Sequence, residues 1–393
     1  MIVLIRSVKQ SGTGSRISAR AAACLLLLCL LNAGCAAGEP ILIGFTAELS
    51  GHNATLGVQS RNGALLAVEE INARGGVAGR TLELVVRDNQ GSPEAVAALD
   101  QELIDMGAFV LTGHNTSWES VAAKSVIDAR SAVLFSPSAS TPLFDHRVDY
   151  FFRMVPSNSE QARSLAGYAY QDMGLRRMAL LNDTDNASFA RPFAEAYRER
   201  FQELGGQNVS YLHFSSKARP DFRALVNTLR ASRAEALLVI ASDADTALIA
   251  QQVRLAGWEA QILATNWSYT SALIKNGGRA VDGLVLPSHF DTDCSTPAYQ
   301  RFRQEYLSSY GNEPAFVSAL SYETIQVIGQ ALEATGGKRD GFAETLTSVR
   351  DFDGLCGKIS LDAHGDARRG LHILKARDGR FELLKTIPPE AAP

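Results

Sequence analysis

The sequence lacks the clusters of positive charge that a nucleic-acid-binding surface needs. Residues 1–38 hold four of the 38 basic side chains and none of the 42 acidic ones, so the remainder has a formal charge of 34 − 42 = −8. No run of lysine and arginine occurs after residue 38, and no segment repeats at a fixed period. These absences exclude a broad nucleic-acid interface and a repeat architecture.

Motifs for metal, redox and hydrolytic chemistry are also missing. There is no Cys-x-x-Cys, His-x-x-x-His, Gly-x-Ser-x-Gly or His-Glu-x-x-His, and no phosphate-binding loop. His52 and His114 lie near expected cleft loops and are the histidines worth testing as bases, but we expect each to be a polar pocket or surface residue. The sequence therefore predicts no enzyme, no metal and no cofactor.

Only two cysteines follow residue 38, Cys294 and Cys356, and they allow two interpretations. In an oxidising compartment they could form a disulfide that closes a loop of about 60 residues and stabilises the fold by roughly 4 kcal/mol. They could equally be two small, buried apolar residues. The sequence leaves this choice open.

The N-terminal segment is typical of a secretory signal. Basic residues precede an apolar run over 21–31, which is too short to span a bilayer. Small residues then lead into Cys35, as in a bacterial lipoprotein signal, although Asn32 stands where leucine is usual. We expect residues 1–38 to be a signal segment that is cut, with cleavage before Cys35 and lipid attachment there favoured over ordinary cleavage near residues 37–38.

From residue 41 onward, short β-rich runs alternate with helical segments, which predicts an α/β fold with parallel sheets. The length of 393 residues favours two cores over one. A Ser- and Pro-rich loop over 136–142 leads to residues 150–155, after which the alternation starts again. It breaks at residues 298–310 and 316–334, two expected helices without a strand between them.

A set of fixed spacings resembles the leucine/isoleucine/valine-binding type of periplasmic solute receptor over residues 41–384. The residues that carry this resemblance are Leu49-Ser50-Gly51, Gly57, Asn62-Gly63, Ala67, Glu70-Ile71-Asn72, Gly75-Gly76-Val77, Gly79-Arg80, Asp88, Gly113 to Ser117, Ser136 to Pro142, Phe352, Gly354, Gly357, Asp362 and Gly365-Asp366.

The resemblance implies a type I periplasmic-binding-protein fold, in which two doubly wound, Rossmann-like lobes are joined by three hinge crossings. Residues 39–155 and 288–350 would form lobe 1, residues 156–287 and 351–388 lobe 2, and residues 389–393 a tail. Ligands of open α/β sheets bind outside the carboxyl ends of the strands, which agrees with a site between the lobes.

On lobe 1, loops rich in small hydroxyl residues follow the expected strands. They contain Ser50, Ser117, Ser138 and Ser140. Ser117 also begins an expected helix, whose N-terminus favours an anion. The resemblance places Ser117, Ser138 and Ser140 where the family holds the carboxylate and ammonium of an amino acid, whereas an N-cap and a turn would be their structural roles.

Lobe 2 departs from the family. An acid that commonly meets the ligand ammonium is replaced by Asn266, so either the ligand lacks an ammonium or another acid serves, with Glu48, Asp185 and Asp243 as candidates. Leu56, Ala187 and Ser242 stand where well-known members have aromatic residues. Trp267, Tyr269 and Phe316 could stack on a ligand, and Phe316 could instead be a core residue.

We therefore expect a receptor in the periplasm or at the outer face of the cell membrane that hands a small polar solute to a membrane ABC permease. Its ligand would be an amino acid or a related carboxylate or amide. A sensor that presents its ligand to a membrane signalling partner is the alternative, and a secreted α/β enzyme is a weaker one. A DNA-binding regulator of the same lobed fold is disfavoured because the signal occupies the place of its helix-turn-helix.

Overall fold

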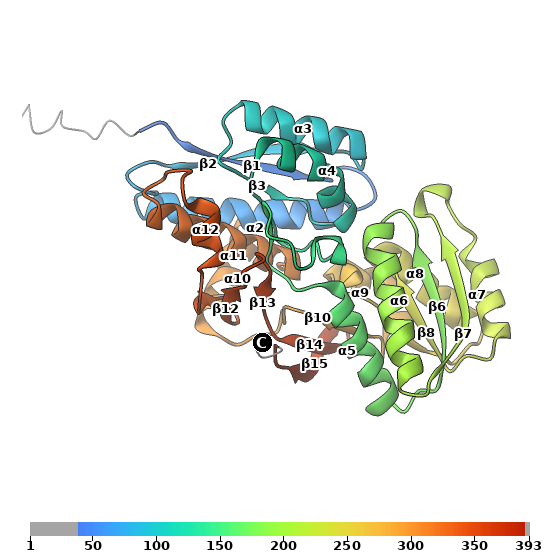
Figure 1. The fold of residues 1–393 in the computed structure, drawn as a ribbon. Helices are drawn as coiled ribbons and strands as arrows, with labels where there is room; N and C mark the ends of the chain where they lie inside the picture. The colour runs from blue at the N-terminus through green and yellow to red at the C-terminus, as the bar shows by residue number, and fades with distance from the viewer. Residues whose placement is uncertain (1–37, 390–393) are drawn as a thin grey trace, which may run out of the picture. The chain divides into compact units, whose positions relative to one another are not determined.

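The computed structural model describes residues 38–389, so the signal segment and Cys35 lie outside the described residues. The strands form three sheets (Figure 1). Their bounds are β1 Ile41–Ala47, β2 Leu82–Asp88, β3 Val110–Gly113, β4 Leu134–Ser136, β5 Phe151–Arg153, β6 Arg177–Asp183, β7 Gln207–Phe214, β8 Ala236–Ile240, β9 Gln261–Leu263, β10 Val285–Ser288, β11 Phe352–Gly354, β12 Gly357–Leu361, β13 Ala367–Arg368, β14 Leu371–Arg377 and β15 Arg380–Ile387.

Most α-helices fall between strands, as expected for doubly wound lobes, and the last three follow one another without a strand between them. Their bounds are α2 Ala54–Ala73, α3 Pro93–Asp105, α4 Ser117–Arg130, α5 Asn158–Gln171, α6 Ala187–Glu203, α7 Phe222–Ala231, α8 Asp243–Leu255, α9 Ser271–Gly277, α10 Pro297–Tyr310, α11 Phe316–Ala334 and α12 Phe342–Thr347. None of these helices is long and apolar enough to cross a bilayer.

The first sheet has the order β2-β1-β3-β4-β5, and all its strands are parallel. Helices α3 and α4 lie on one of its faces, and α2 with α11 lies on the other (Figure 1). Because both faces are covered, its central strands are apolar and buried: Ile43 and Phe45 of β1 have no exposed surface. We call this sheet and its helices the first lobe.

The second sheet has the order β15-β14-β10-β9-β8-β6-β7. Strands β6 to β10 pair in parallel, and β14 and β15 add an antiparallel hairpin beside β10. Helices α5 and α6 pack together on the nearer side of this sheet in Figure 1. We call this sheet and its helices the second lobe.

Two positions of the first lobe require glycine because another segment's backbone lies too close for a side chain. A Cβ on Gly63 would lie 2.0 Å from the carbonyl oxygen of Ser318, so this glycine lets α2 approach α11. A Cβ on Gly57 would lie 2.0 Å from the carbonyl oxygen of Glu48. This second glycine lets the first turns of α2 lie against the end of β1.

The late helices α10 and α11 pack on α2 although the chain reaches them from the second sheet. Tyr306 of α10 donates a hydrogen bond to Gln59 (2.6 Å), and Ser321 of α11 contacts Ser60 (2.5 Å). The chain thus crosses between the two sheets after β5, after β10 and after β13. This return explains the two consecutive helices in the sequence.

Residues 352–368 differ from the expectation that all of 351–388 joins the second lobe. They form a separate sheet, β11-β12-β13, whose Leu355 N–H donates to buried Glu323 of α11 (2.7 Å). Fully buried Arg153 of β5 forms ion pairs with Asp366 (2.5 Å) and Asp145 (2.6 Å). These contacts to the first lobe outweigh sequence proximity to β14.

Cys294 and Cys356 are joined by a disulfide in the structure. The bond links the segment after β10 to the turn between β11 and β12. Of the two interpretations of this pair, the structure selects the covalent one.

Candidate functional site

The first lobe contributes the loops that follow β3 and β4. Ser117 is the first residue of α4, and Thr116, rather than Ser117, is its N-cap. Ser138 donates a hydrogen bond to the carbonyl oxygen of Asn115 (2.7 Å), and the Ser117 hydroxyl oxygen accepts one from the N–H of Ser140 (3.4 Å). The Ser117 hydroxyl proton has no acceptor among the described residues, so it can point to a ligand at the helix N-terminus.

Glu119 completes the first turn of α4 and is almost fully buried. Its carboxyl accepts hydrogen bonds from the N–H (2.8 Å) and hydroxyl (2.7 Å) of Thr116 and from Asn89 (2.7 Å). Burial raises the pKa of Glu119, and these hydrogen bonds oppose the rise. The carboxyl holds the loop from Asn115 to Ser117 in place behind the site.

The second lobe contributes residues that follow β6 and β9. Asn186 precedes α6, and Asn266 and Trp267 lie in a 3₁₀ turn directly after β9. Carboxyl ends of parallel strands meet at one edge of a sheet, so these side chains face the same space. Phe189 packs edge-on against Trp267, with 5.9 Å between ring centroids.

These walls enclose a small cavity between the lobes, which we call the neutral cavity because no ionisable side chain lines it. Its volume is about 20 Å³, enough for the centre of roughly one water molecule. A larger solute can enter only if the walls separate. The lining residues are Leu56, Asn115, Thr116, Ser117, Ser138, Asn186, Phe189, Asn266, Trp267 and Phe316.

The neutral cavity is surrounded by buried polar atoms that lack a partner. Both side-chain polar atoms of Asn115, and the amide oxygens of Asn186 and Asn266, have no hydrogen-bond partner among residues 38–389. Buried polar groups in folded proteins are nearly always paired, because each unpaired group costs about 1–3 kcal/mol. Four such atoms belong to residues that line this one cavity, which makes it the candidate binding site for a ligand with hydrogen-bonding groups.

A second cavity adjoins the first and shares Asn186 and Trp267 with it. We call it the charged cavity, and its volume is also about 20 Å³. Its lining residues are Glu48, His52, Asn53, Gly91, Trp118, Asp183, Asp185, Asn186, Lys217 and Trp267. Acidic side chains outnumber Lys217 here, so the two neighbouring cavities differ sharply in charge.

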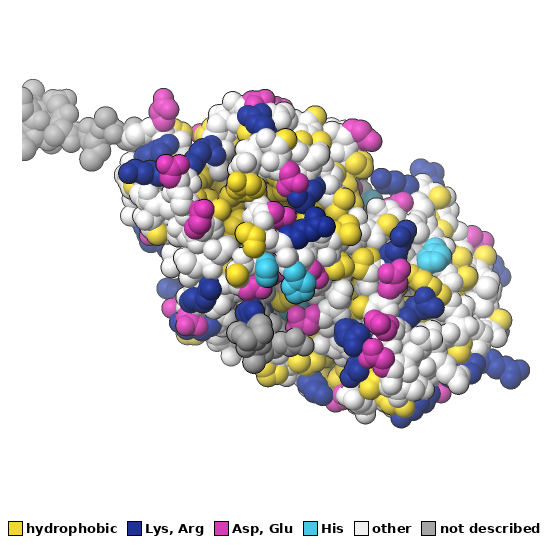
Figure 2. Space-filling view, in the orientation of Figure 1, with side chains coloured by type: hydrophobic (Ala, Val, Ile, Leu, Met, Phe, Trp, Pro, Cys, Tyr) yellow, Lys and Arg dark blue, Asp and Glu magenta, His cyan; other side chains and the backbone are white. Residues whose placement is uncertain are grey.

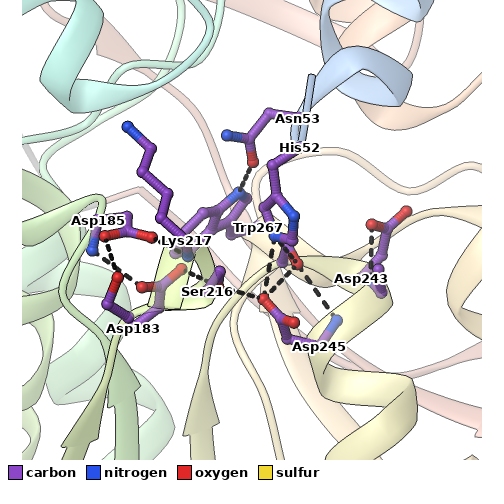
Figure 3. A network of polar contacts seen from close by, with 12 residues as sticks. His52, Asn53, Asp183, Asp185, Ser216, Lys217, Asp243, Asp245 and Trp267 are labelled. Carbon is purple, nitrogen blue, oxygen red and sulfur yellow. Dashed lines mark hydrogen bonds and ion pairs between the residues drawn. The ribbon is translucent and has the colours of Figure 1, made fainter. Parts of the chain in front are cut away.

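Hydrogen bonds across the charged cavity join the two lobes (Figure 3). The indole N–H of Trp267 donates to Asn53 (3.3 Å). His52 lies 3.0 Å from both Ser242 and Asp245 of the second lobe. These contacts stabilise a closed arrangement of the lobes.

The pKa values of this network follow from its contacts. The hydrogen bond to Asp245 raises the pKa of His52 against the opposing effect of burial. Burial works against ionisation of Asp245, but hydrogen bonds from His52 and Ser216 hold its pKa below the ordinary value. Burial raises the pKa of Asp183.

Of the predicted ligand-binding residues, five line the neutral cavity and three do not. Ser117, Ser138, Asn266, Trp267 and Phe316 line it. Ser50 is exposed and donates its hydroxyl to Asp88 (2.6 Å). Ser140 is fully buried behind the wall, and Asp243 accepts a hydrogen bond from Thr270 (2.6 Å) as the first residue of α8.

The remaining residues that the sequence suggested lie in two kinds of place: some line the charged cavity, and others are buried away from both cavities. Glu48, Asp185 and His52 line the charged cavity. His114 has no exposed surface and lies 2.9 Å from buried Asp100, so it meets no solvent or substrate. Tyr269 is buried, packs on Phe316 and lies away from both cavities' linings.

Sequence reasoning overlooked Asn115, Asn186 and Phe189. Asn115 lies inside the Gly113 to Ser117 block, and Asn186 directly precedes a helix after an expected strand. A polar residue between a strand and a helix was the available signal. Nothing in the sequence separates such residues from ordinary helix caps.

The surface gives no sign of a single-charge interface on the face drawn in Figure 2. Basic and acidic side chains are interspersed there. This pattern agrees with the lack of basic runs in the sequence.

Comparisons with known proteins connect this geometry to a family. The model of the periplasmic binding protein family matches residues 40–380. The chain is 26% identical over 344 residues to an amino acid binding protein from Pseudomonas aeruginosa, covering 86% of this chain and 91% of that protein.

Solved structures agree with the family match. A leucine binding protein from Thermotoga maritima matches with a TM-score of 0.83 and 26% identity, over 89% of this chain and 99% of that one. A solute binding protein of an ABC transporter from Rhodopseudomonas palustris, in complex with benzoate, has a TM-score of 0.81 and 18% identity, over 90% and 98%. The second likeness concerns the fold alone.

Proposed function

This chain belongs to the periplasmic binding protein family, which implies an extracytoplasmic location, and from this premise we propose that it is the solute receptor of an ABC importer. The solute binds between the lobes at the neutral cavity. The observation that carries the proposal is the ring of unpaired amide atoms of Asn115, Asn186 and Asn266.

The solute is a small carboxylate whose anionic end meets Ser117 and Ser138 at the N-terminus of α4. The helix dipole and the free Ser117 hydroxyl proton favour negative charge there. Leu56, Phe189 and Trp267 provide an apolar surface for the rest of the solute. An aromatic carboxylate fits these properties.

The absence of an ionisable side chain from the neutral cavity argues against an α-ammonium group in the solute. An ammonium buried without a counter-charge loses its hydration without compensation. An amino acid remains the alternative if its ammonium reaches Glu48 or Asp185 in the adjoining charged cavity. Named relatives and neighbours bind either amino acids or benzoates, so both chemistries occur in this fold.

Binding drives closure because each lobe supplies part of the contacts. A solute that touches both walls binds the closed form more tightly, and the equilibrium shifts by that difference in affinity. A membrane permease would then dock the closed form. The lipid anchor at Cys35 remains a proposal, and it would hold the receptor near that permease.

The test is a thermal-shift and calorimetric screen of the mature chain with benzoate, benzamide and leucine, after partial unfolding and refolding to remove carried-over solute. Benzoate should raise Tm more than leucine does, since bound solute stabilises by mass action. Stabilisation by leucine alone would show that an acid meets the ammonium. Stabilisation by none of these solutes would reject the assigned ligand class.

A paired substitution tests the site itself. Changing Ser117 and Ser138 together to valine should abolish the solute-induced rise in Tm, because the added methyl groups occupy the anion position. Ser50→Ala is the matched control, since Ser50 lies outside the cavity. A double variant that is folded by circular dichroism and still responds to solute would exclude this site.

A further inference from the structure

Three side chains in Figure 3 bring metal-binding atoms together across the lobes. A ring nitrogen of His52 and carboxylate oxygens of Asp183 and Asp245 all lie within 4.8 Å of one another. Asp183 has no exposed surface and Asp245 is 5% exposed, whereas the His52 side chain is 34% exposed. We call these three residues the His52 cluster.

The carboxylate oxygens of the His52 cluster have more contacts to hydroxyl groups than those hydroxyl groups have protons to donate. The Ser216 hydroxyl lies 2.7 Å from Oδ2 of Asp183 and 2.6 Å from Oδ2 of Asp245, yet it has one proton to donate. The Ser242 hydroxyl and His52 Nε2 both face the same oxygen of Asp245, each at 3.0 Å. With both acids ionised, one carboxylate contact of Ser216 is left without a proton, so this hydroxyl cannot satisfy Asp183 and Asp245 together.

A cation would relieve this arrangement better than water. Two buried carboxylates that are close together repel each other strongly, because the surroundings screen them poorly. His52 and Asp183 also line the charged cavity, where Glu48 and Asp185 add negative charge and Lys217 is the one lysine of the lining. The cavity provides a route by which a small cation could reach the cluster.

We propose that the His52 cluster is a binding site for a divalent transition-metal ion such as Zn²⁺, bridging the two lobes. One imidazole nitrogen and two carboxylate oxygens form a set of ligands that zinc accepts, while Mg²⁺ and Ca²⁺ prefer oxygen alone. Ligand atoms around a tetrahedral zinc lie about 3.3 Å apart, so small side-chain rotations suffice. Water takes the remaining position.

The position of the site gives the metal a consequence for solute binding. His52 comes from the loop after β1 in the first lobe, and Asp183 and Asp245 come from β6 and α8 in the second. The complete set of ligands exists only when the lobes are together, so metal favours the closed form. If the proposed receptor function holds, metal and solute each raise the affinity for the other.

The direct test measures zinc without any solute, so it stands or falls independently of the proposed function. The mature chain, treated with EDTA and dialysed, is titrated with Zn²⁺ by calorimetry, and bound zinc is counted by elemental analysis. We expect one Zn²⁺ per chain and a rise in Tm of about 2 °C or more that EDTA reverses.

Variants locate the ion. His52→Gln and Asp245→Asn keep hydrogen-bonding groups but should lose stoichiometric zinc, and Asp183→Asn serves as a third variant if either is poorly folded. His146→Gln is the matched control, because His146 is exposed and packs against His364 at 5.7 Å between ring centroids, another place where zinc could attach. Circular dichroism and Tm without metal check that each variant folds.

The outcomes separate clearly. Zinc lost in the His52→Gln and Asp245→Asn variants and retained in His146→Gln supports the site. No stoichiometric binding to the wild-type chain, or equal binding by His52→Gln, overturns it. A benzoate affinity about fivefold or more higher with zinc than without it would establish the coupling of metal and solute.

Discussion

The neutral and charged cavities adjoin each other and share Asn186 and Trp267, yet their chemistry is opposite. The first has amides, hydroxyls and apolar rings. The second has three acids, a histidine and a lysine. The difference shows that position between two lobes does not by itself decide what binds. The side chains that follow each strand determine which ligand can bind. They leave the neutral cavity without ionisable groups and place three acids, a histidine and a lysine in the charged cavity.

The largest expected effect comes from placing a charge in the neutral cavity. Asn266→Asp should weaken benzoate binding by about 100-fold or more, because two like charges 4 Å apart near a protein surface repel by about 4 kcal/mol. Calorimetry measures the affinity. The control Asn266→Ala removes one hydrogen bond and should cost about tenfold or less. Equal losses in both variants would mean that the cavity is insensitive to charge.

His289, away from both cavities, shows how much a buried charge would reduce the free energy of unfolding of this protein. It is 4% exposed, and burial lowers its pKa to about 3. The unfolded chain takes up this proton near pH 6.5, but the folded protein does not until about pH 3. Stability is therefore lost as the pH falls, by about 2 kcal/mol at pH 5.

Urea unfolding of wild-type and His289→Gln chains between pH 7.5 and 4.5 checks this expectation. The variant should lose less stability over that range, whereas His146→Gln, at an exposed position, should follow the wild type. Parallel curves for wild type and His289→Gln would contradict a neutral buried imidazole.

Removing the link between the cavities should have a smaller effect. Trp267→Phe keeps a ring in the neutral cavity but deletes the N–H that donates to Asn53 across the lobes. The closed form should lose about 1 kcal/mol, so solute binding should weaken roughly fivefold. Calorimetric affinities for benzoate test this, with Trp258→Phe as the control because its N–H bonds within the second lobe.

The smallest effect is expected in the charged cavity. Asp185→Asn should change benzoate affinity less than twofold, because Asp185 instead accepts hydrogen bonds from Ser215 (2.8 Å) and Lys217 N–H (2.9 Å). The same calorimetric series with leucine sharpens the comparison. A tenfold loss of leucine affinity would place an ammonium beside Asp185 and connect the two cavities functionally.

Much of the fold was predictable because periodicity is a local property. The parallel strands β1, β6 and β8 follow from apolar runs such as 236–240, and the helices follow from 3.6-residue spacing. Short elements such as α9 and α12 were not predicted, since seven or six residues carry too little periodic signal. The contacts of 352–368 with Glu323 and Arg153 could not be predicted, because these partners are distant in sequence.

The site was predictable to the extent that strand ends identify loops. Ser117 and Ser138 follow β3 and β4, and Asn266 follows β9, so all three reach the neutral cavity. Ser50 and Asp243 also follow strands, but local hydrogen bonds to Asp88 and Thr270 occupy them. A sequence does not show which polar side chains already have partners.

The sequence by itself determined the α/β class and the hydroxyl-rich loops at the strand ends, because both depend on residue spacing along the chain. Its resemblance to a family also predicted that the late helices pack on the first lobe. Only the tertiary structure decided that Asn115, Asn186 and Asn266 keep unpaired atoms around one cavity, and that His52 meets Asp183 and Asp245 across the lobes. Those contacts join segments up to about two hundred residues apart, such as His52 and Asp245, so they depend on packing that no local pattern specifies.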